Sequence, residues 1–343
     1  MGGDCLNTGC VPSKALIEAA RRAKGAASAK NLGVSYNDVT VDYASVMRHV
    51  RETIAAIEPH DSQERFEGLG VRVIRGYAEF ASKNSVRVGD ETLTARRIVV
   101  AAGATPIAPP INGLDAVAYF TNETFFENYD RPDHLIIIGG GPIGVEMAQA
   151  HAQLGIETTL IERFEILPRE ISETREIVRT KLLQDGVTIF ENCDVISIKE
   201  NGTIKSIIFG DGQMIEGSHI LVATGRRANI QGLNLSEAGI EATDVGIKVD
   251  DSLRTTNRDV YAIGDVIGQE QFTHVSGYHA SLVVRSALFG RPAKVKKDHI
   301  PRVTYCDPEV ASVGAFRCLR PLRRVPRLRR PVHLRWRLAP PLR

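Results

Sequence analysis

Two stretches near the start of the chain carry apolar residues at the spacing of an amphipathic helix. The first is CVPSKALIEAARRAK at residues 10–24, with Pro12 in its first turn, where a missing N–H costs little. The second is DYASVMRHVRETIAAIE at residues 42–58. The pattern therefore predicts two helices, each with one apolar face turned to a core.

Beyond these helices the pattern changes to short β-rich runs separated by polar and Gly-containing turns. One run opens a longer unit, HLIIIGGGPIGVEMAQAHAQLGIETTLIE at residues 134–162, which reads as strand, glycine turn, helix and strand. Another helix is predicted at residues 277–290. The other strand-like runs are residues 71–80, 85–89, 96–104, 188–200, 204–210 and 218–225. This alternation predicts an α/β protein.

The overall composition is that of an ordinary globular protein. At 343 residues, the chain is long enough for two to three domains. No apolar run reaches membrane-spanning length, and the start lacks the pattern of a signal peptide, so we expect a cytoplasmic location and no membrane partner. Five cysteines in so long a chain do not indicate a disulfide scaffold; in a reducing compartment a close pair is more often catalytic or metal-binding.

Such a close pair, Cys5 and Cys10, lies at the start of the chain. Five residues of regular helix rise about 7.5 Å, whereas a disulfide needs Cα atoms no more than about 7 Å apart. The intervening LNTG must therefore curl, with the helix proper starting near Cys10. A helix N-terminus and Lys14 one turn on would both favour a thiolate at Cys10. Buried thiols or half of a zinc site are the alternatives, but no second ligand pair at short spacing accompanies them.

The glycine turn of residues 139–144 has the form G-x-G-x-x-G directly between a strand and a helix, the context in which this motif binds a dinucleotide. The first Gly permits the turn, the second lets backbone approach a pyrophosphate, and the third packs helix on strand. An acidic residue at the end of the next strand favours NADH over NADPH, although Arg163 and Arg169 nearby leave NADPH open. The residues expected at the nucleotide are Gly139, Gly140, Gly141, Pro142, Ile143, Gly144 and Glu162.

With these motifs in place, GGDCLNTGCVPSK at residues 2–14 resembles the redox-disulfide signature of the flavin-dependent pyridine nucleotide–disulfide oxidoreductases. That family includes dihydrolipoamide dehydrogenase, glutathione reductase and mercuric reductase. The resemblance covers residues 2–314, and the sequences of its motifs are closer to those of mercuric reductase-like than of glutathione reductase-like members. The supporting motifs, in the family's order, are IVVAAGATP, GGGPIGVE, LVATGRR, TTNRDVYAIGDV and TYCDPEVASVG.

The resemblance implies two Rossmann-like domains, binding FAD and NAD(P), and a stub of an α+β dimerisation domain. Relatives carry a further strand and glycine loop ahead of this signature and an interface domain after it, so we expect the FAD domain to be incomplete and the family's homodimer to be doubtful here. The expected segments are 1–125 for the partial FAD-binding domain, 126–243 for the NAD(P)-binding domain, 244–293 for the return to the FAD-binding domain, 294–314 for the dimerisation stub and 315–343 for a tail.

The resemblance also assigns roles to the redox residues. Cys5 matches the interchange thiol, Cys10 the thiol stacked on the flavin, and Lys14 the lysine beside the flavin ring. Electrons would pass from NAD(P)H through FAD to the Cys5–Cys10 pair and on to an external small disulfide or metal ion, or in reverse for a lipoamide-type substrate. The remaining cysteines Cys193, expected in a strand, and Cys306 are assigned structural roles.

Further positions match the family's cofactor contacts. Asp265 resembles the aspartate that bonds the flavin's ribityl chain, and Thr273 falls where the backbone meets the flavin. Ala78 matches a contact at the adenine end of FAD, Gly225 lines the nicotinamide-nucleotide side, and Glu146 is the acidic residue just after the glycine loop. An alternative interpretation is a non-catalytic fragment that retains only an NAD-binding module.

The last 29 residues differ from the rest. Residues 315–343 hold ten arginines and no Lys, Asp or Glu, which leaves the preceding part with a net charge of −8. A frameshift in GC-rich coding sequence explains this composition best. A nucleic-acid-binding arm would use the arginines on phosphates but lacks interleaved aromatics, and prolines would break a membrane-surface helix. We therefore do not expect nucleic acid as a partner.

Overall fold

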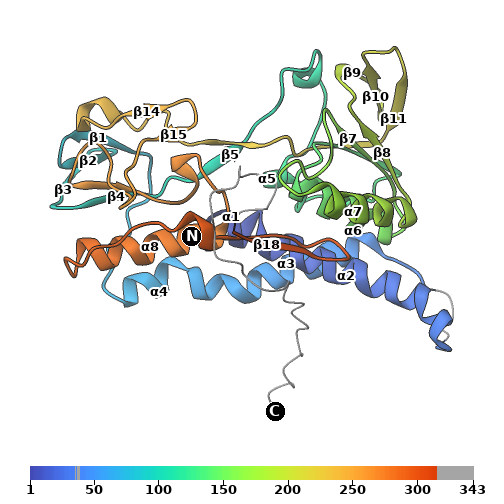
Figure 1. The fold of residues 1–343 in the computed structure, drawn as a ribbon, viewed down its shortest axis with the longest axis horizontal. Helices are drawn as coiled ribbons and strands as arrows, with labels where there is room; N and C mark the ends of the chain where they lie inside the picture. Colours follow the sequence, from blue (N-terminus) through green and yellow to red (C-terminus); the bar gives the residue numbers. More distant parts are fainter. Residues whose placement is uncertain (35, 37–38, 315–343) are drawn as a thin grey trace, which may run out of the picture.

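The computed structural model describes residues 1–34, 36 and 39–314; the expectations for the Arg-rich tail lie outside this part of the chain. Figure 1 shows two lobes that stand on a layer of helices near the ends of the sequence. The α/β class expected from the pattern is confirmed. Within the described residues, no helix combines the length and the apolar character needed to cross a membrane.

The N-terminal helices form the layer under the lobes. The short α1 (Gly3–Asn7) leads into α2 (Cys10–Ser28), and α3 (Tyr43–Ile57) packs beside it. The Asp42 side chain caps α3 by accepting the Ser45 N–H. Both predicted helices are thus confirmed. The first helix begins at Cys10, as the cysteine spacing required, and extends to Ser28.

One lobe is built on a parallel sheet with the strand order β12-β6-β7-β8. The strands β12, β6 and β7 are largely buried, whereas the edge strand β8 has one buried residue, Val187. Side chains of α2 and α3 share one core with α6. The antiparallel strands β9–β11 extend from this lobe (Figure 1). The elements are α5 (Asn122–Phe125), β6 (His134–Ile138), α6 (Pro142–Gln153), β7 (Glu157–Glu162), α7 (Ser172–Gln184), β8 (Val187–Glu191), β9 (Val195–Asn201), β10 (Ile204–Phe209), β11 (Met214–Gly217) and β12 (His219–Val222).

The other lobe has its own core, centred on Tyr261 and Phe80. Three antiparallel strands, β1–β3, lie beside a parallel pair formed by β4 and β16, while β5 pairs with β13 and so joins the two lobes (Figure 1). The elements are α4 (Gln63–Gly68), β1 (Ala78–Ser82), β2 (Ser85–Val88), β3 (Glu91–Thr94), β4 (Ile98–Val100), β5 (Ala104–Pro106), β13 (Arg226–Ala228), β14 (Ala242–Thr243), β15 (Gly246–Ile247), β16 (Val260–Ala262) and α8 (Thr273–Ala287).

The hairpin of β17 (Pro301–Thr304) and β18 (Val310–Val313) returns to the helical layer, where Figure 1 shows it lying across α2. Arg21 of α2 donates to the carbonyls of Tyr305 and Cys306 and pairs with Glu309. Gln149 of α6 bonds both the N–H and the C=O of Asp307. Side chains of the helices α2 and α6 therefore hold the hairpin turn in place through hydrogen bonds to its backbone.

Three expectations at element level are corrected. The strand expected from residue 71 begins at Ala78, since no described strand pairs with the residues before it and a strand needs a ladder partner. The helix expected from residue 277 begins at Thr273. Cys193 lies in the connection between β8 and β9 rather than in a strand.

A further helix, α7, has no counterpart in the sequence-based expectations. Val178 and Leu182 are its buried residues, so its apolar face is too narrow to give a strong period.

Candidate functional site

The glycine turn connects β6 to α6 in the way the motif predicts. Gly139 has φ 116°, and a Cβ there would lie 2.4 Å from the carbonyl oxygen of Ala223. A Cβ on Gly144 would lie 1.8 Å from the oxygen of Gly139, so helix and turn can approach only without a side chain. Gly141 is the N-cap of α6, Pro142 follows it, and a Cβ on Gly141 would meet open space. The open N–H groups of this helix start can receive an anionic group.

Glu162 lies at the end of β7, directly beside this turn. Its Oε2 accepts the Gly140 N–H at 2.6 Å and its Oε1 accepts the Phe164 N–H at 3.0 Å. The two arginines that left NADPH open are paired elsewhere: Arg163 with Asp194 at 2.8 Å and Arg169 with Glu270 at 3.3 Å. The charge that a ribose would meet here is therefore the carboxylate.

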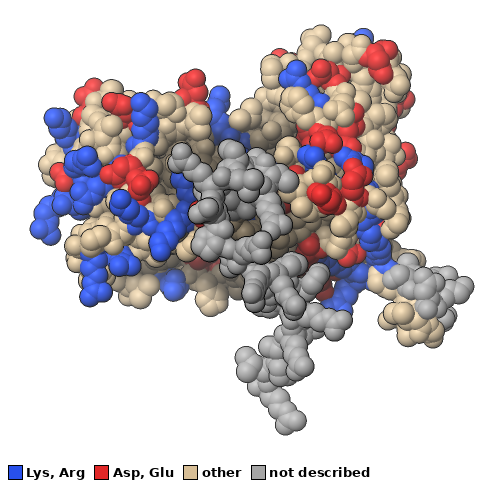
Figure 2. Space-filling view, viewed as in Figure 1, with Lys and Arg blue, Asp and Glu red and all other residues tan. Residues whose placement is uncertain are grey.

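The charge on the visible face of this lobe (Figure 2) does not favour an anion. On the face in Figure 2, Asp and Glu gather over the lobe that carries α7, whereas Lys and Arg are more numerous on the lobe of β1–β3. A phosphate at the glycine turn would consequently depend on the local backbone N–H groups and helix dipole and not on the field of the lobe.

The two thiols meet at the start of α2. Cys10 is its first residue after the N-cap Gly9, where a Cβ would lie 2.7 Å from the Asp4 carbonyl oxygen, so the curl between the cysteines requires glycine. The Cys10 Sγ lies 3.1 Å from the Thr273 hydroxyl at the start of α8. Both cysteines are free thiols and half-buried. The curl thus places two thiols and a hydroxyl together from opposite ends of the sequence.

The electrostatics divide the two thiols. A hydrogen bond from the Cys5 thiol is the largest cause that lowers the Cys10 pKa to about 6, and Thr273 and the Lys14 charge add to it against the effect of burial. The pKa of Cys5 is raised, first because Cys5 donates to Cys10 and then because of burial. At neutral pH the pair therefore holds a thiolate on Cys10 and a proton on Cys5.

Lys14 stands between the thiols and the glycine-turn helix. Its Nζ donates to Glu146 Oε2 at 2.9 Å and to Ser13 Oγ at 3.1 Å. Glu146 lies on α6, and its side chain is only 6% exposed. A nearly buried carboxylate needs such a partner, so this ion pair links the thiol helix to the helix of the glycine turn.

A second polar cluster, centred on Arg226, was missed by the sequence reasoning. Its guanidinium bonds Asp4, the residue before Cys5, and the Ala104 carbonyl, and its Nε lies 3.7 Å from Asp265 Oδ2. That Nε is buried and has no hydrogen-bond partner among the residues that the structure describes. Burial raises the pKa of Asp265, and Arg226 opposes the shift. The first Arg of the LVATGRR motif is Arg226, but nothing in its local sequence pointed to partners this far away in the chain.

The remaining predicted residues lie in separate places. Gly225 follows β12, whose carboxyl end adjoins the glycine turn through the hydrogen bond from Ala223 N–H to the Ile138 carbonyl. Ala78 is exposed at the start of β1, in the other lobe (Figure 1). Asp265 and Thr273 lie with the thiols, and Ile143 is 41% exposed beside the glycine turn. The structure thus forms two groups, the thiol group and the glycine-turn group, with Ala78 apart from both.

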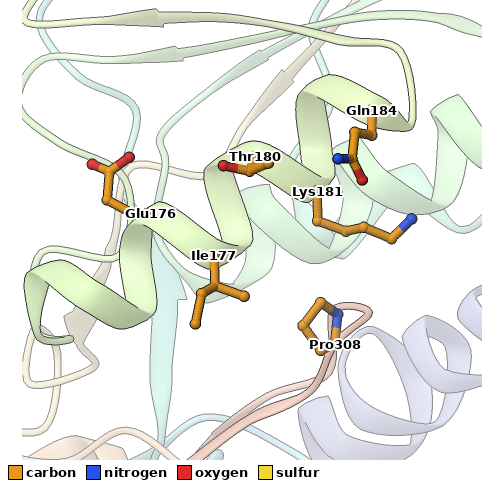
Figure 3. A pocket seen from close by; sticks show the side chains of 6 residues that line it. All are labelled: Glu176, Ile177, Thr180, Lys181, Gln184 and Pro308. Carbon is orange, nitrogen blue, oxygen red and sulfur yellow. The ribbon is translucent and has the colours of Figure 1, made fainter.

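A hollow of about 390 Å³ lies between α7 and the hairpin turn and contains none of the predicted site residues. Figure 3 shows Lys181 and Pro308 facing each other across it, with Ile177 pointing into the opening. Among the described residues, no group of three or more His, Cys, Asp or Glu side chains could hold a metal ion. The chemistry-bearing residues therefore remain those of the two groups.

Comparison with known proteins identifies the family of the chain. The profile of the family described as pyridine nucleotide-disulphide oxidoreductase matches residues 1–280. The chain is 34% identical over 319 residues to a mercuric reductase of Bacillus cereus, with 92% of this chain and 51% of that protein covered. It is 34% identical over 332 residues to a dihydrolipoyl dehydrogenase of Bacillus subtilis, with 92% and 68% covered. The chain thus spans about half the length of the first of these relatives.

Solved structures give the same picture. The Cu(II) complex of the HOCl-induced flavoprotein disulfide reductase RclA from Escherichia coli superimposes with a TM-score of 0.80 at 27% identity, covering 92% of this chain and 70% of that one. LpdA from Mycobacterium tuberculosis gives a TM-score of 0.83 at 26% identity, with the same coverage. The arrangement of the two lobes is accordingly one that these proteins share.

Proposed function

We propose a role in flavin-dependent disulfide oxidoreduction for this chain, which belongs to the pyridine nucleotide-disulphide oxidoreductase family. Enzymes of this family use FAD and NAD(P)H. The observation that carries the proposal is the thiol group: Cys10 starts α2, lies 3.1 Å from the Thr273 hydroxyl, and has the Lys14 ammonium one turn away. Such a site stabilises one thiolate of a pair, which is what thiol–disulfide exchange requires.

The residues on the thiol side fit a flavin. Arg226 Nε is a buried donor without a partner in the described structure, and the Asp265 carboxylate beside it is an acceptor, so both can bind the polar chain of a flavin cofactor. Lys14 and Thr273 would lie at its ring, and Ala78 at its adenine end. When bound, FAD supplies the chemistry of hydride acceptance and electron transfer to the thiols.

The chain's own residues bind the nucleotide and set which of the two thiols, Cys5 or Cys10, keeps its proton. The N–H groups at Gly141 would hold the pyrophosphate of NAD(P)H, and Glu162 would accept hydrogen bonds from the ribose hydroxyls, which favours NADH. In the reduced pair Cys10 is the thiolate and Cys5 keeps the proton. Once Cys5 has lost that proton to a base, its sulfur attacks an external disulfide and releases one thiolate. Cys10 then attacks Cys5, releases the second thiolate and closes the Cys5–Cys10 disulfide.

We propose a small disulfide or a metal ion as the electron acceptor. The support is the likeness to proteins named mercuric reductase and dihydrolipoyl dehydrogenase. Members of this family are typically homodimers.

The test is reconstitution followed by turnover. The purified chain is incubated with FAD, desalted and examined for a flavin spectrum; NADH oxidation is then followed with lipoamide or mercuric chloride as acceptor. We expect retained flavin and acceptor-dependent NADH oxidation that Cys10→Ser abolishes. A colourless protein after desalting, or NADH oxidation unaffected by Cys10→Ser, would contradict the proposal.

A second candidate is a nucleotide-binding module without redox turnover. It is favoured by the completeness of the β6–α6–β7 unit, in which both strands, the glycine turn and the helix lie in one continuous segment. This candidate predicts NADH binding without flavin retention. In either case Gly141→Val, which puts a side chain where the pyrophosphate must approach, is expected to weaken NADH binding at least tenfold, as measured by fluorescence titration. Equal binding by the variant would remove the glycine turn from both candidates.

A further inference from the structure

We propose that Tyr305 is a positioning residue, whose aromatic face holds the Lys14 ammonium in place one helical turn from the Cys10 thiol. The inference rests on the proposed function, since it assigns a role within the same thiol group. Tyr305 belongs to the turn of the β17–β18 hairpin, which follows Cys10 by almost the whole described chain.

The contacts of Lys14 define one position for its charge. The Nζ lies 4.3 Å from the centroid of the Tyr305 ring and 2.9 Å from Glu146 Oε2. An ammonium over an aromatic face is attracted by the negative face of the ring. A lysine side chain is long and flexible, and that of Lys14 is 36% exposed, so without the ring it could turn to solvent. The Tyr305 ring and the Glu146 carboxylate therefore hold the Lys14 ammonium between them.

The backbone of Tyr305 is fixed independently of its ring. Its N–H donates to Glu146 Oε1 at 2.8 Å, and its C=O accepts from Arg21 at 3.4 Å. Two residues further on, Gln149 donates to the Asp307 carbonyl at 2.8 Å and accepts from its N–H at 2.6 Å. Replacing the Tyr305 side chain would leave these bonds in place, so a substitution tests the ring and not the hairpin.

The position of Lys14 matters because the charges near Cys10 are few and of opposite sign. Lys14, on its own helix, lowers the Cys10 pKa and Glu146, on α6, raises it; Cys5 and the Thr273 hydroxyl lower it by hydrogen bonding. If the ammonium moves to solvent, the Glu146 carboxylate acts on Cys10 without its counterion. The Cys10 pKa should then rise, while the bonds from Cys5 and Thr273 keep it below that of an ordinary thiol.

The experiment measures Cys10 ionisation in the reduced, full-length chain without added flavin. The rate of iodoacetamide labelling is followed against pH, and the label is assigned by fragment sequencing of the peptide that carries both cysteines. We expect Tyr305→Leu to raise the apparent Cys10 pKa by about half a unit, and Tyr305→Phe, which keeps the aromatic face, to match the unchanged protein. Tyr129→Leu, at a 44% exposed tyrosine outside both site groups, is the matched control and should also leave the profile unchanged.

Coupling to Lys14 distinguishes positioning from a general effect. Lys14→Met should raise the Cys10 pKa more than Tyr305→Leu does, and adding Tyr305→Leu to Lys14→Met should change nothing further. Equal profiles for Tyr305→Leu and the unchanged protein, or an undiminished effect in the Lys14→Met background, would overturn the inference while leaving the proposed function intact. If Cys10 ionises like an ordinary thiol in the protein without substitutions, this result would instead contradict the proposed function itself.

Discussion

The glycine-turn group and the thiol group are built in opposite ways. Most residues of the first lie within residues 134–162, in the consecutive elements β6, α6 and β7. The second joins residues separated by 132, 222 and 263 positions, in the contacts Lys14–Glu146, Asp4–Arg226 and Cys10–Thr273. A nucleotide site can thus be specified by a short local sequence. A thiol pair in which one sulfur is ionised and the other protonated depends instead on contacts between residues far apart in the sequence.

The largest expected effect breaks the local group. Gly144→Ala would place a Cβ 1.8 Å from the Gly139 carbonyl oxygen, and this oxygen belongs to the backbone, which cannot move aside as a flexible side chain can. We expect a loss of more than about 3 kcal/mol in the free energy of unfolding, because α6 must separate from the turn. Urea denaturation followed by circular dichroism measures this, and NADH binding should be lost with it.

The matched control lies three residues earlier in the same turn. A Cβ on Gly141 meets nothing within 4 Å among the described residues, and the φ of Gly141 is −70°, so Gly141→Ala should fold normally. It should nonetheless bind NADH less tightly, because the added methyl group stands where the pyrophosphate approaches. If Gly141→Ala and Gly144→Ala lose the same free energy of unfolding, the assignment of helix packing to Gly144 and of ligand approach to Gly141 is wrong.

The next largest effect breaks the thiol group at its polar centre. Arg226→Met removes the guanidinium between Asp4 and Asp265 but keeps much of the buried side-chain volume. Because the Asp265 carboxylate would then be buried beside no cation, we expect a loss of about 2 kcal/mol in the free energy of unfolding near neutral pH. Urea denaturation measures it, with Arg226→Lys as the variant that keeps the charge.

The pH dependence of this loss has a defined sign. Burial already raises the folded-state pKa of Asp265, and losing Arg226, which opposes that shift, raises it further. A carboxyl with a raised folded pKa contributes stability that is present below its unfolded pKa and is lost as the pH rises through its folded pKa. The deficit of Arg226→Met should therefore be larger at about pH 7 than at about pH 4.5. The same deficit at both pH values would mean that Asp265 is not the group left unpaired.

How much the sequence could predict follows the same division. The helix start at Cys10, the glycine turn and the position of Glu162 were predictable because each depends on residues within a few positions. The partners of Lys14 and Arg226 were not, because no periodicity or spacing encodes which distant carboxylate a folded chain brings near. The helix α7 was not predicted for a related reason. Its apolar face is narrow, and its other faces form salt bridges, such as Arg179 with Glu191, which a pattern of hydrophobic residues does not reveal.

The smallest expected effect concerns a single hydroxyl. Thr273→Val keeps the shape of the side chain at the start of α8 but removes the oxygen 3.1 Å from Cys10 Sγ. Because the Cys5 thiol still donates to Cys10, we expect the Cys10 pKa to rise by only about half a unit, with the free energy of unfolding changed by less than about 0.5 kcal/mol. The pH profile of iodoacetamide labelling measures the shift.

Thr273→Ser, which retains the hydroxyl, is the variant that should restore the original labelling profile. NADH binding through the glycine turn should stay the same in both variants, since the turn lies in a different lobe and shares no contact with Thr273 in the described structure. A shift of equal size in the Ser and Val variants would assign the effect to packing at α8. A change in NADH binding would show that the two groups are coupled more tightly than the Lys14–Glu146 pair alone explains.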